Sequence, residues 1–342
     1  MRDERIDVLR FIGLAMIILA HSGPPEAIFQ ARTFDVPLMV IVAGLSFRAS
    51  YKEEPYLSYL WKRVKRLLFP VWLFLSIYFL VISTTGYPIA APSIKKIASS
   101  YLLLDDGGIG YVWIIRVFLL VASVSPFIIS FCRRTSSHRK YMLTMVAIYV
   151  TYELILSISR PFLNSLPGYI FEEIILYLVP YAVVFSIGLR LPEFGRNQLL
   201  LMAAAAFIIF GVWTGELWIL SGKAIPIQDF KYPPQSYYLS YAIFVSVVAW
   251  ILSERIIPFL RNSFIFPAIQ FVAQNSIWIY LWHIPFRESF RFTPLPFYLK
   301  YPLVFAGATL FTFLQVRFVK QHVLLNLNNP SLKRNLSSLL TG

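Results

Sequence analysis

The sequence predicts an all-α polytopic membrane protein, a bundle of about ten transmembrane helices with both termini in the cytoplasm. Three observations lead to this prediction. Hydrophobic residues make up 58% of the 342 residues and charged residues only 14%, whereas soluble domains average about 25% charged. Apolar runs long enough to cross a hydrocarbon core of about 30 Å recur along the whole chain. Lys and Arg are unevenly divided between alternate connecting segments.

Ten apolar runs have membrane-spanning length, with some tilt or local thinning of the bilayer for the shorter ones. The first run follows the charged segment MRDER and lacks a small-residue cleavage site. We therefore expect it to be retained as a helix rather than removed as a signal peptide. The ten runs cover residues 6–22, 34–50, 67–84, 111–131, 141–158, 170–189, 198–221, 237–253, 268–286 and 302–319.

The distribution of basic residues determines the predicted topology. With the N-terminus inside, the cytoplasmic segments carry 18 Lys and Arg residues and the external segments carry 9. The positive-inside rule predicts this bias when both termini are cytoplasmic. The net charge of +14 therefore reflects topology, and we expect no nucleic-acid partner. The single cysteine, Cys132, excludes an internal disulfide and a thiolate metal cluster, and we expect no metal site.

The chain is predicted to form one membrane domain over residues 1–325, followed by a short polar cytoplasmic tail over 326–342. The composition of this tail is typical of a disordered chain end. The two longest external connections, residues 85–110 and 222–236, combine turn residues with aromatic and charged ones, and such loops are where a substrate would be met. No internal repeat is visible, which weakens the case for an inverted-repeat transporter.

Arg10 and His21 are two ionisable residues in the first apolar run. Such residues are costly to bury, and their presence favours a functional role. An imidazole titrates near neutral pH, so His21 can accept a proton from a hydroxyl and return it to a leaving group. Eleven residues correspond to about 20° beyond three helical turns, so Arg10 and His21 share a stripe. Asp7 lies three residues before Arg10 on the same face. The alternative is a structural histidine hydrogen-bonded across a helix interface.

A second group of residues lies in WKRVKRLLFP, at the cytoplasmic start of the third apolar run. Arg63 and Arg66 are three residues apart, so both guanidinium groups project from one helical face and can bind phosphates. The alternative is that this basic cluster anchors anionic lipid headgroups and sets topology.

Other polar and aromatic residues in the apolar runs are less specific. Arg116 is a candidate partner for another buried charge. For Asp35, at the outer start of the second run, we weigh two roles: orienting His21, or complementing the dipole of its own helix. His283 is expected to have a supporting or interfacial role rather than a catalytic one. Trp278 and Trp282, with the similar Trp113, are interpreted as aromatic residues of the membrane interface.

These residues give the chain a recognisable pattern. The segments RIDVLRFIGLAMIILAHS, ARTFDVPLMVIVAGLSFRAS, KRVKRLLFPVWLF and SIWIYLWHIPF together resemble the acyltransferase 3 family of membrane O-acyltransferases. That family has an Arg or Lys separated by ten intervening residues from a His in its first helix, and an R-x-x-R at the start of its third. The resemblance follows the chain in order and in helix number.

The resemblance implies that an acyl group, usually acetyl, passes from cytoplasmic acyl-CoA to a hydroxyl of a carbohydrate across the membrane. The acceptor would be a surface polysaccharide such as lipopolysaccharide O-antigen, or its lipid-linked precursor, at a bacterial inner membrane. By the same resemblance His21 would be the catalytic histidine and Arg10 its motif partner. Arg63 and Arg66 would bind acetyl-CoA or another acyl-CoA. Membrane lipids are the remaining expected partner.

Several alternatives stay open from the sequence. Transfer can be direct or pass through an acyl-histidine, and Arg10 or Arg116 could stabilise the developing oxyanion. A transporter or flippase for a lipid-linked glycan or small anion would also account for ten helices and buried charges. A polysaccharide polymerase would need a large external loop rich in Arg and Glu, and the external loops here hold few such residues.

Overall fold

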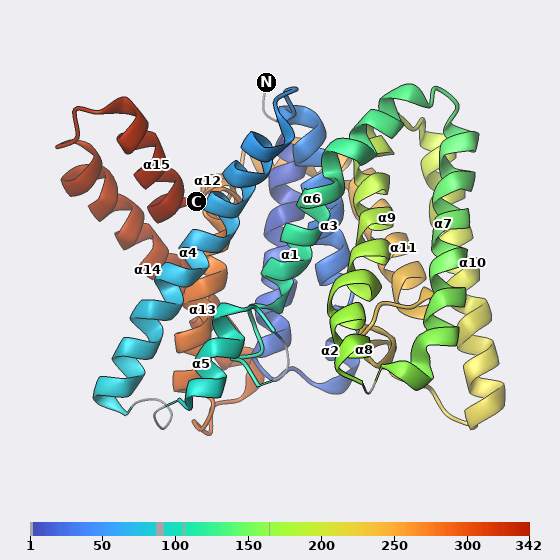
Figure 1. Cartoon of the computed structure of the whole chain (residues 1–342), viewed down its shortest axis with the longest axis horizontal. Helices are drawn as coiled ribbons and strands as arrows, with labels where there is room; N and C mark the ends of the chain where they lie inside the picture. The colour runs from blue at the N-terminus through green and yellow to red at the C-terminus, as the bar shows by residue number, and fades with distance from the viewer. Residues whose placement is uncertain (1–2, 87–91, 105–106, 164) are drawn as a thin grey trace. The chain divides into compact units, whose positions relative to one another are not determined.

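The structure is a computed structural model that describes residues 3–86, 92–104, 107–163 and 165–342. Within these residues all regular secondary structure is helical (Figure 1). The α-helices are α1 (Glu4–His21), α2 (Glu26–Ala31), α3 (Asp35–Ser50), α4 (Tyr56–Thr85), α5 (Ile94–Tyr101), α6 (Trp113–Arg134), α7 (His138–Ser159), α8 (Leu166–Phe171), α9 (Tyr177–Arg190), α10 (Arg196–Ser221), α11 (Ser236–Arg261), α12 (Phe266–Gln274), α13 (Ser276–Phe290), α14 (Phe297–Phe318) and α15 (Pro330–Thr341).

Eight helical segments among the described residues are long and apolar enough to cross a membrane, and the predicted class of polytopic helical membrane protein is confirmed. Each coincides with one of the ten predicted runs. The eight segments are Glu26–Ser50, Tyr56–Thr85, Trp113–Arg134, His138–Phe162, Pro167–Glu193, Arg196–Ser221, Ser236–Arg261 and Phe297–Leu324.

The other two predicted runs form helices with different properties. Run 6–22 is α1, whose first two turns carry four charged residues. Run 268–286 is divided between α12 and α13, which are only 9 and 15 residues long. The division lies at Asn275, whose side-chain amide donates to the backbone oxygen of Phe271 at 2.8 Å. A side chain that bonds its own backbone in this way competes with the regular helix.

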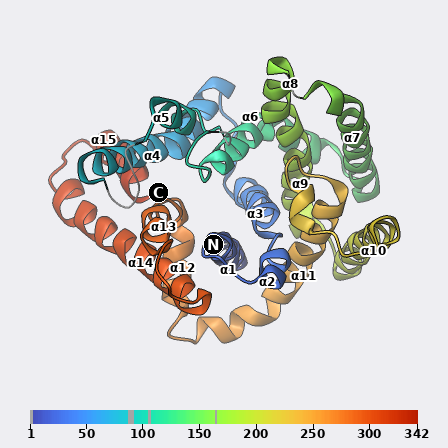
Figure 2. The same cartoon turned by 90° about the horizontal axis from the view of Figure 1, so that it is seen from below.

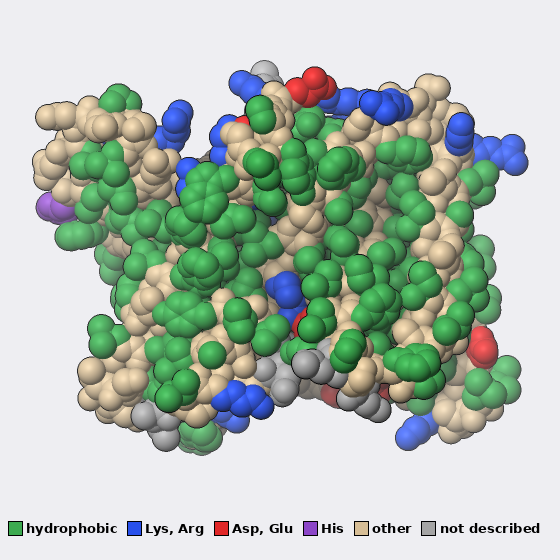
Figure 3. Space-filling view, in the orientation of Figure 1, with side chains coloured by type: hydrophobic (Ala, Val, Ile, Leu, Met, Phe, Trp, Pro, Cys, Tyr) green, Lys and Arg blue, Asp and Glu red, His purple; other side chains and the backbone are tan. Residues whose placement is uncertain are grey.

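The lipid-facing surface is visible on individual helices. Along α10, Leu201, Ile208, Val212 and Ile219 are each more than 60% exposed, an arrangement that suits contact with hydrocarbon and would be unfavourable in water. Figure 3 shows the same pattern on α4 and α7, where hydrophobic side chains cover the middle of each helix and basic side chains lie near its N-terminal end. The helices therefore have the apolar middle section expected of membrane spans.

The structure can be compared with the predictions for the two external connections and for the C-terminal tail. Residues 87–91 and 105–106 of the connection 85–110 lie outside the described residues, and α5 occupies part of the remainder. The connection 222–236 contains the short helical turn Ile227–Phe230. The prediction that the tail is disordered is wrong for residues 330–341, which form α15. The backbone oxygens of Leu339 and Leu340 accept hydrogen bonds from α13 and α14. The domain boundary at residue 325 stays a prediction.

The chain forms two compact units, which are described separately. Unit 1 contains residues 1–13, 26–53 and 120–266, and unit 2 contains residues 14–25, 54–119 and 267–342. In unit 1 the helices α3 and α9 lie side by side in both views (Figures 1 and 2). A Cβ atom on Gly44 would be 2.4 Å from the backbone oxygen of Phe185, and one on Gly188 would be 2.3 Å from that of Ile41. Glycine at these two positions therefore permits the close packing of α3 and α9.

Unit 2 is assembled around α13. The ring of Phe286 lies against Gly307 of α14, where a Cβ atom would be only 2.8 Å from the ring. On another face of α13, Trp282 meets Phe74 of α4 in an edge-to-face contact with ring centroids 5.5 Å apart. Tyr301 of α14 donates to the backbone oxygen of Ala15 in α1 at 3.3 Å. These contacts hold the C-terminal part of α1 in unit 2.

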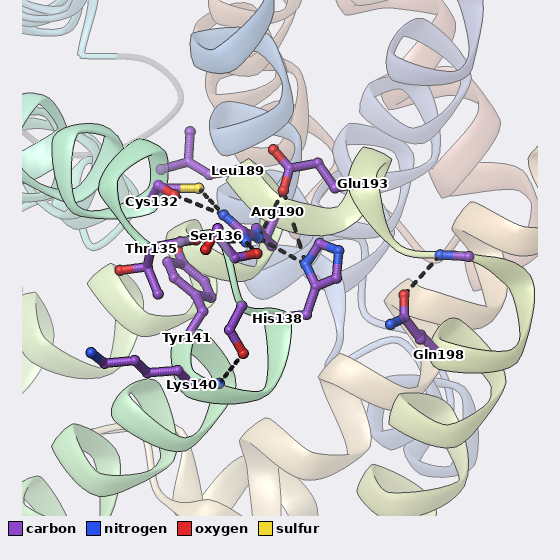
Figure 4. A network of polar contacts seen from close by, with 12 residues as sticks. Cys132, Thr135, Ser136, His138, Lys140, Tyr141, Leu189, Arg190, Glu193 and Gln198 are labelled. Atoms are coloured by element: carbon purple, nitrogen blue, oxygen red, sulfur yellow. Dashed lines mark hydrogen bonds and ion pairs between the residues drawn. The ribbon is translucent and has the colours of Figure 1, made fainter.

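Arg190, at the end of α9, is the centre of a polar network in unit 1 (Figure 4). The residue is 3% exposed. Its guanidinium donates to the backbone oxygens of Cys132, Thr135 and Ser136 at 2.7 to 2.9 Å. Its Nε donates to His138 Nδ1 at 3.0 Å and forms an ion pair with Glu193 at 2.8 Å. One side chain therefore satisfies the polar groups where α6 ends and α7 begins.

We expect Arg190→Gln to destabilise the protein by about 3 to 5 kcal/mol, because the substitution leaves three buried backbone oxygens without their charged donor and removes one of the two arginines paired with Glu193. The matched control is Arg133→Gln, because the Arg133 ion pair with Glu53 is 52% and 84% exposed and should contribute less than about 1 kcal/mol. Thermal unfolding of both detergent-purified variants measures the difference. Equal losses would show that Arg190 is not a centre of stability.

Candidate active site

His21, the last residue of α1, contacts a second histidine. Its Nδ1 lies 2.9 Å from Nε2 of His283 in α13. The two rings are stacked, with centroids 5.1 Å apart and planes 14° from parallel. His283 is completely buried, whereas His21 is partly exposed. Both residues belong to unit 2, and the structure thus joins two histidines 262 positions apart in the sequence.

The hydrogen bonds of His283 fix the positions of the protons in the neutral pair. Its Nδ1 contacts the backbone oxygen of Tyr280, and because a carbonyl only accepts, Nδ1 carries the hydrogen. Nε2 of a neutral His283 then has a lone pair and accepts from Nδ1–H of His21. The lone pair of His21 is consequently at its Nε2. This arrangement can take up a proton at His21 Nε2 while His283 orients the ring.

A group of charged and aromatic side chains surrounds the histidine pair. Arg287 donates from Nε to the backbone oxygen of His21 at 3.1 Å and from Nη1 to Glu288 Oε1 at 2.6 Å. The same carboxylate oxygen accepts from the Tyr111 hydroxyl at 3.1 Å. The Tyr111 ring meets His21 edge-on, with centroids 4.8 Å apart. Tyr280 donates its hydroxyl to the backbone oxygen of Tyr111.

Sequence reasoning assigned no role at the site to Tyr111, Arg287 or Glu288. Two signals could have identified the last two. Arg287 follows His283 by four residues and therefore shares its helical face. Glu288 is the only acidic residue after Glu254, so it is the obvious counter-ion for the basic residues near it. Tyr111 gave no comparable signal, because tyrosines are frequent in this chain.

Arg10 and Asp7 lie in the part of α1 that belongs to unit 1. Arg10 Nη2 donates to the Ser46 hydroxyl oxygen of α3 at 2.6 Å. Its Nη1 lies 3.9 Å from the carboxylate of Asp7, as the spacing of three residues predicts, and Asp7 is almost fully buried. Arg10 and His21 are thus on one continuous helix, about 16 Å apart along its axis.

Arg63 and Arg66 lie three residues apart in the second and third turns of α4. The Arg63 guanidinium is 5.1 Å from the ring centroid of Tyr59, and the Arg66 side chain is exposed. Glu54 lies just before α4. The hydrogen bond from Lys62 is the main cause that lowers the pKa of its carboxyl below the ordinary value, and the positive charge of Arg63 lowers this pKa further. The start of α4 is therefore cationic and accessible to an anionic ligand.

Asp35 and Arg116, the other predicted supporting residues, have separate partners. Asp35 is buried in unit 1 and binds Arg32 at 2.9 Å and Lys231 at 3.4 Å. The residue that contacts His21 Nδ1 in the structure is His283, and the orienting role of Asp35 stays a prediction. Arg116 of α6 is buried in unit 2 and donates to the backbone oxygen of Leu103 at 3.1 Å. Among the described residues, no cluster of three or more His, Cys, Asp or Glu could hold a metal ion.

The predicted interface aromatics also differ from the structure in their burial. Trp278 is only 1% exposed and Trp113 only 6%. Trp278 donates its indole N–H to the backbone oxygen of Leu339 at 3.1 Å. Both rings are thus buried within the protein rather than exposed at a lipid interface.

A comparison with protein-family models identifies the chain. The model of the acyltransferase domain named Acyl_transf_3 matches residues 3–315. The chain belongs to the acyltransferase 3 family. It is therefore a membrane acyltransferase, and the resemblance on which the sequence analysis relied is confirmed. No curated protein and no solved structure matches the chain.

We expect His283→Ala to lower kcat for acyl transfer by about a hundredfold with little change in the KM for the donor, because the His21 ring loses the acceptor that fixes its tautomer. His283→Gln places an amide oxygen near the position of Nε2 and should recover part of kcat. Kinetics of both variants, normalised to protein in the membrane, measure the effect. Equal losses in the two variants, or a loss of membrane protein alone, would contradict an orienting role.

Proposed function

We propose that this acyltransferase moves an acetyl group from cytoplasmic acetyl-CoA to a hydroxyl of a cell-surface carbohydrate, such as lipopolysaccharide O-antigen or its lipid-linked precursor. Its membrane would be the bacterial inner membrane, with both termini in the cytoplasm. The observation that carries the proposal is the contact of His21 Nδ1 with His283 Nε2, in a chain that belongs to an acyltransferase family. Together with the contact of His283 with Tyr280, it assigns the lone pair of a neutral His21 to Nε2. A nitrogen base of this kind is what an acceptor hydroxyl needs near neutral pH.

In the proposed reaction, His21 Nε2 takes the proton of the sugar hydroxyl as the oxygen attacks the thioester carbonyl. The carbon–sulfur bond then breaks, and the CoA thiolate leaves and receives the proton from the imidazolium. His283 accepts the Nδ1–H of His21 throughout and keeps the ring in place. We assign the stabilisation of the oxyanion to Arg116, because a guanidinium donates to developing negative charge and Arg10 lies about 16 Å from His21 along α1.

Arg63 and Arg66 are the proposed binding residues for the donor. Acyl-CoA carries phosphate groups, and two guanidinium groups on one helical face bind such groups better than isolated lysines do. The cationic start of α4 supports this role, because its acidic neighbour Glu54 is already paired with Lys62. Arg10, on the N-terminal side of His21, would support the donor side of the site.

We expect His21→Ala to abolish transfer of labelled acetyl groups from acetyl-CoA to added glycans in membranes, because the variant lacks the proposed base. His322→Ala is the matched control, since His322 is exposed in the segment after α14 and should retain full activity. Label on sugar is also incompatible with a protein that only transports glycans. If His21→Ala kept wild-type transfer at normal abundance, His21 would be structural.

We expect Arg63→Gln and Arg66→Gln each to raise the apparent KM for acetyl-CoA about tenfold or more, because a hydrogen bond to a charged group contributes about 1.5 to 3 kcal/mol. Lys65→Gln, between the two arginines in the sequence, should have a smaller effect. Initial rates at varied acetyl-CoA concentration test this. An unchanged KM with reduced membrane insertion would instead support the topological role of the cluster.

A further inference from the structure

An apolar groove lies on unit 2, between α4, α13, α14 and the end of α15. Its volume is about 400 Å³. Helix α13 contributes Trp278 and Trp282, α14 contributes Phe311 and Phe318, and α15 contributes Leu340. No residue of the proposed active site lines the groove. It is therefore a separate feature of the molecule.

The polar atoms of the groove are engaged in holding its walls together. Gln315 accepts from the indole N–H of Trp282 at 2.6 Å and donates to the backbone oxygen of Leu340 at 2.7 Å. The indole N–H of Trp278 donates to the backbone oxygen of Leu339. The surface presented to an occupant consists of aromatic faces and aliphatic side chains. Hydrocarbon is the chemistry that fits such a surface.

The groove opens on the membrane-facing side of the helices. Ile77 of α4 is 41% exposed, and Leu314 and Phe318 of α14 are 53% and 61% exposed. The groove residues of α14, from Phe311 to Phe318, span about 10 Å along the helix axis. One leaflet of the hydrocarbon core is about 15 Å thick, half of the whole. The length of the groove thus suits an acyl chain from a single leaflet.

Basic residues precede the groove on two of its helices. On α15, Lys333 lies seven residues before Leu340. On α4, Arg66 lies seven residues before Leu73. Seven residues are close to two helical turns, so each cation is on the same helical face as its groove residue, about 10 Å away along the axis. Both cations are exposed. Helices α15 and α4 lie side by side in Figures 1 and 2. An occupant with its tail in the groove can therefore place its polar end at these cations.

The net positive charge beside the groove favours an occupant whose headgroup is negatively charged. Residues 317–342, which include the C-terminal end of α14 and the whole of α15, contain four Lys and Arg and no Asp or Glu. A headgroup with a net negative charge gains about 1 kcal/mol for each nearby Lys or Arg at the membrane surface, which corresponds to about fivefold in affinity. A zwitterionic headgroup gains much less. The basic residues beside the groove therefore favour a lipid with an anionic headgroup.

We propose that this groove binds one acyl chain of an anionic membrane phospholipid, whose phosphate-bearing headgroup lies at Lys333 and Arg66. The bound lipid would fasten α15 to α4 and α14. This inference is independent of the proposed function, because none of the lining residues belongs to the proposed active site. Since Arg66 is also assigned to the donor, the test relies on Lys333 and on the groove itself.

The experiment measures lipid retention by the full chain in detergent, using native mass spectrometry with phosphatidylglycerol and phosphatidylcholine of identical acyl chains. The wild type should retain phosphatidylglycerol preferentially. Lys333→Gln should lower that retention about fivefold and leave phosphatidylcholine unchanged. Leu314→Trp, which fills the groove, should lower the retention of both lipids.

Two control variants lie in the N-terminal half of α14, away from the groove residues Phe311 to Phe318. Lys300→Gln removes a cation and Leu303→Trp adds an indole at a position that is 46% exposed, and neither should alter retention. Equal retention of the two lipids by the wild type would overturn the proposal. So would a loss in Lys300→Gln as large as that in Lys333→Gln. Loss with Lys333→Gln but not with Leu314→Trp would show headgroup binding without the groove, and would also overturn it.

Discussion

One constraint determines where polar side chains lie inside this helical bundle. Because hydrocarbon offers them no hydrogen bonds, the protein must supply their partners. The partners that result determine which helices meet. The contact of His21 with His283 joins α1 to α13, and Arg190 joins the end of α9 to the connection between α6 and α7. Asp35 binds Arg32 and Lys231 for the same reason. Few ionisable groups are buried, and each one specifies a packing arrangement.

The apolar pattern of the sequence predicts the membrane helices well because their length and composition are local properties. Eight of the ten predicted runs coincide with helices of spanning length. The division at Asn275 was not predicted, because the three amides of this run, Gln270, Gln274 and Asn275, are uncharged and the run remains apolar on average. Helix α15 was missed because its composition is polar. Its leucines at 332, 336, 339 and 340 nevertheless recur with helical spacing, and this periodicity was the available signal.

For the candidate site, the sequence predicts only what one helix determines. The approach of Asp7 to Arg10 follows from their spacing, and the position of His21 at the end of the first helix follows from the length of the apolar run. The identity of the partner at His21 Nδ1 could not follow, because 262 positions separate it from His283. Asp35 was a reasonable candidate by charge. Its carboxylate, however, is paired with two cations in unit 1, and only the tertiary structure reveals that.

In the histidine pair, His283 donates to a backbone carbonyl, that of Tyr280, rather than to a carboxylate. This difference affects the energy of the site. In a hydrolase triad an ionised carboxylate orients the histidine and stabilises the imidazolium that forms. A carboxylate buried beside His21 would carry a desolvation cost of several kcal/mol, whereas a neutral His283 hydrogen-bonded to Tyr280 carries much less. The neutral partner still fixes the tautomer that leaves Nε2 basic. It would give less stabilisation to an imidazolium. The Glu288 carboxylate, linked to the pair through Tyr111 and Arg287, places a negative charge in the same group of side chains. In the proposed mechanism the site would thus separate orientation from charge stabilisation, and a low-dielectric environment favours that separation.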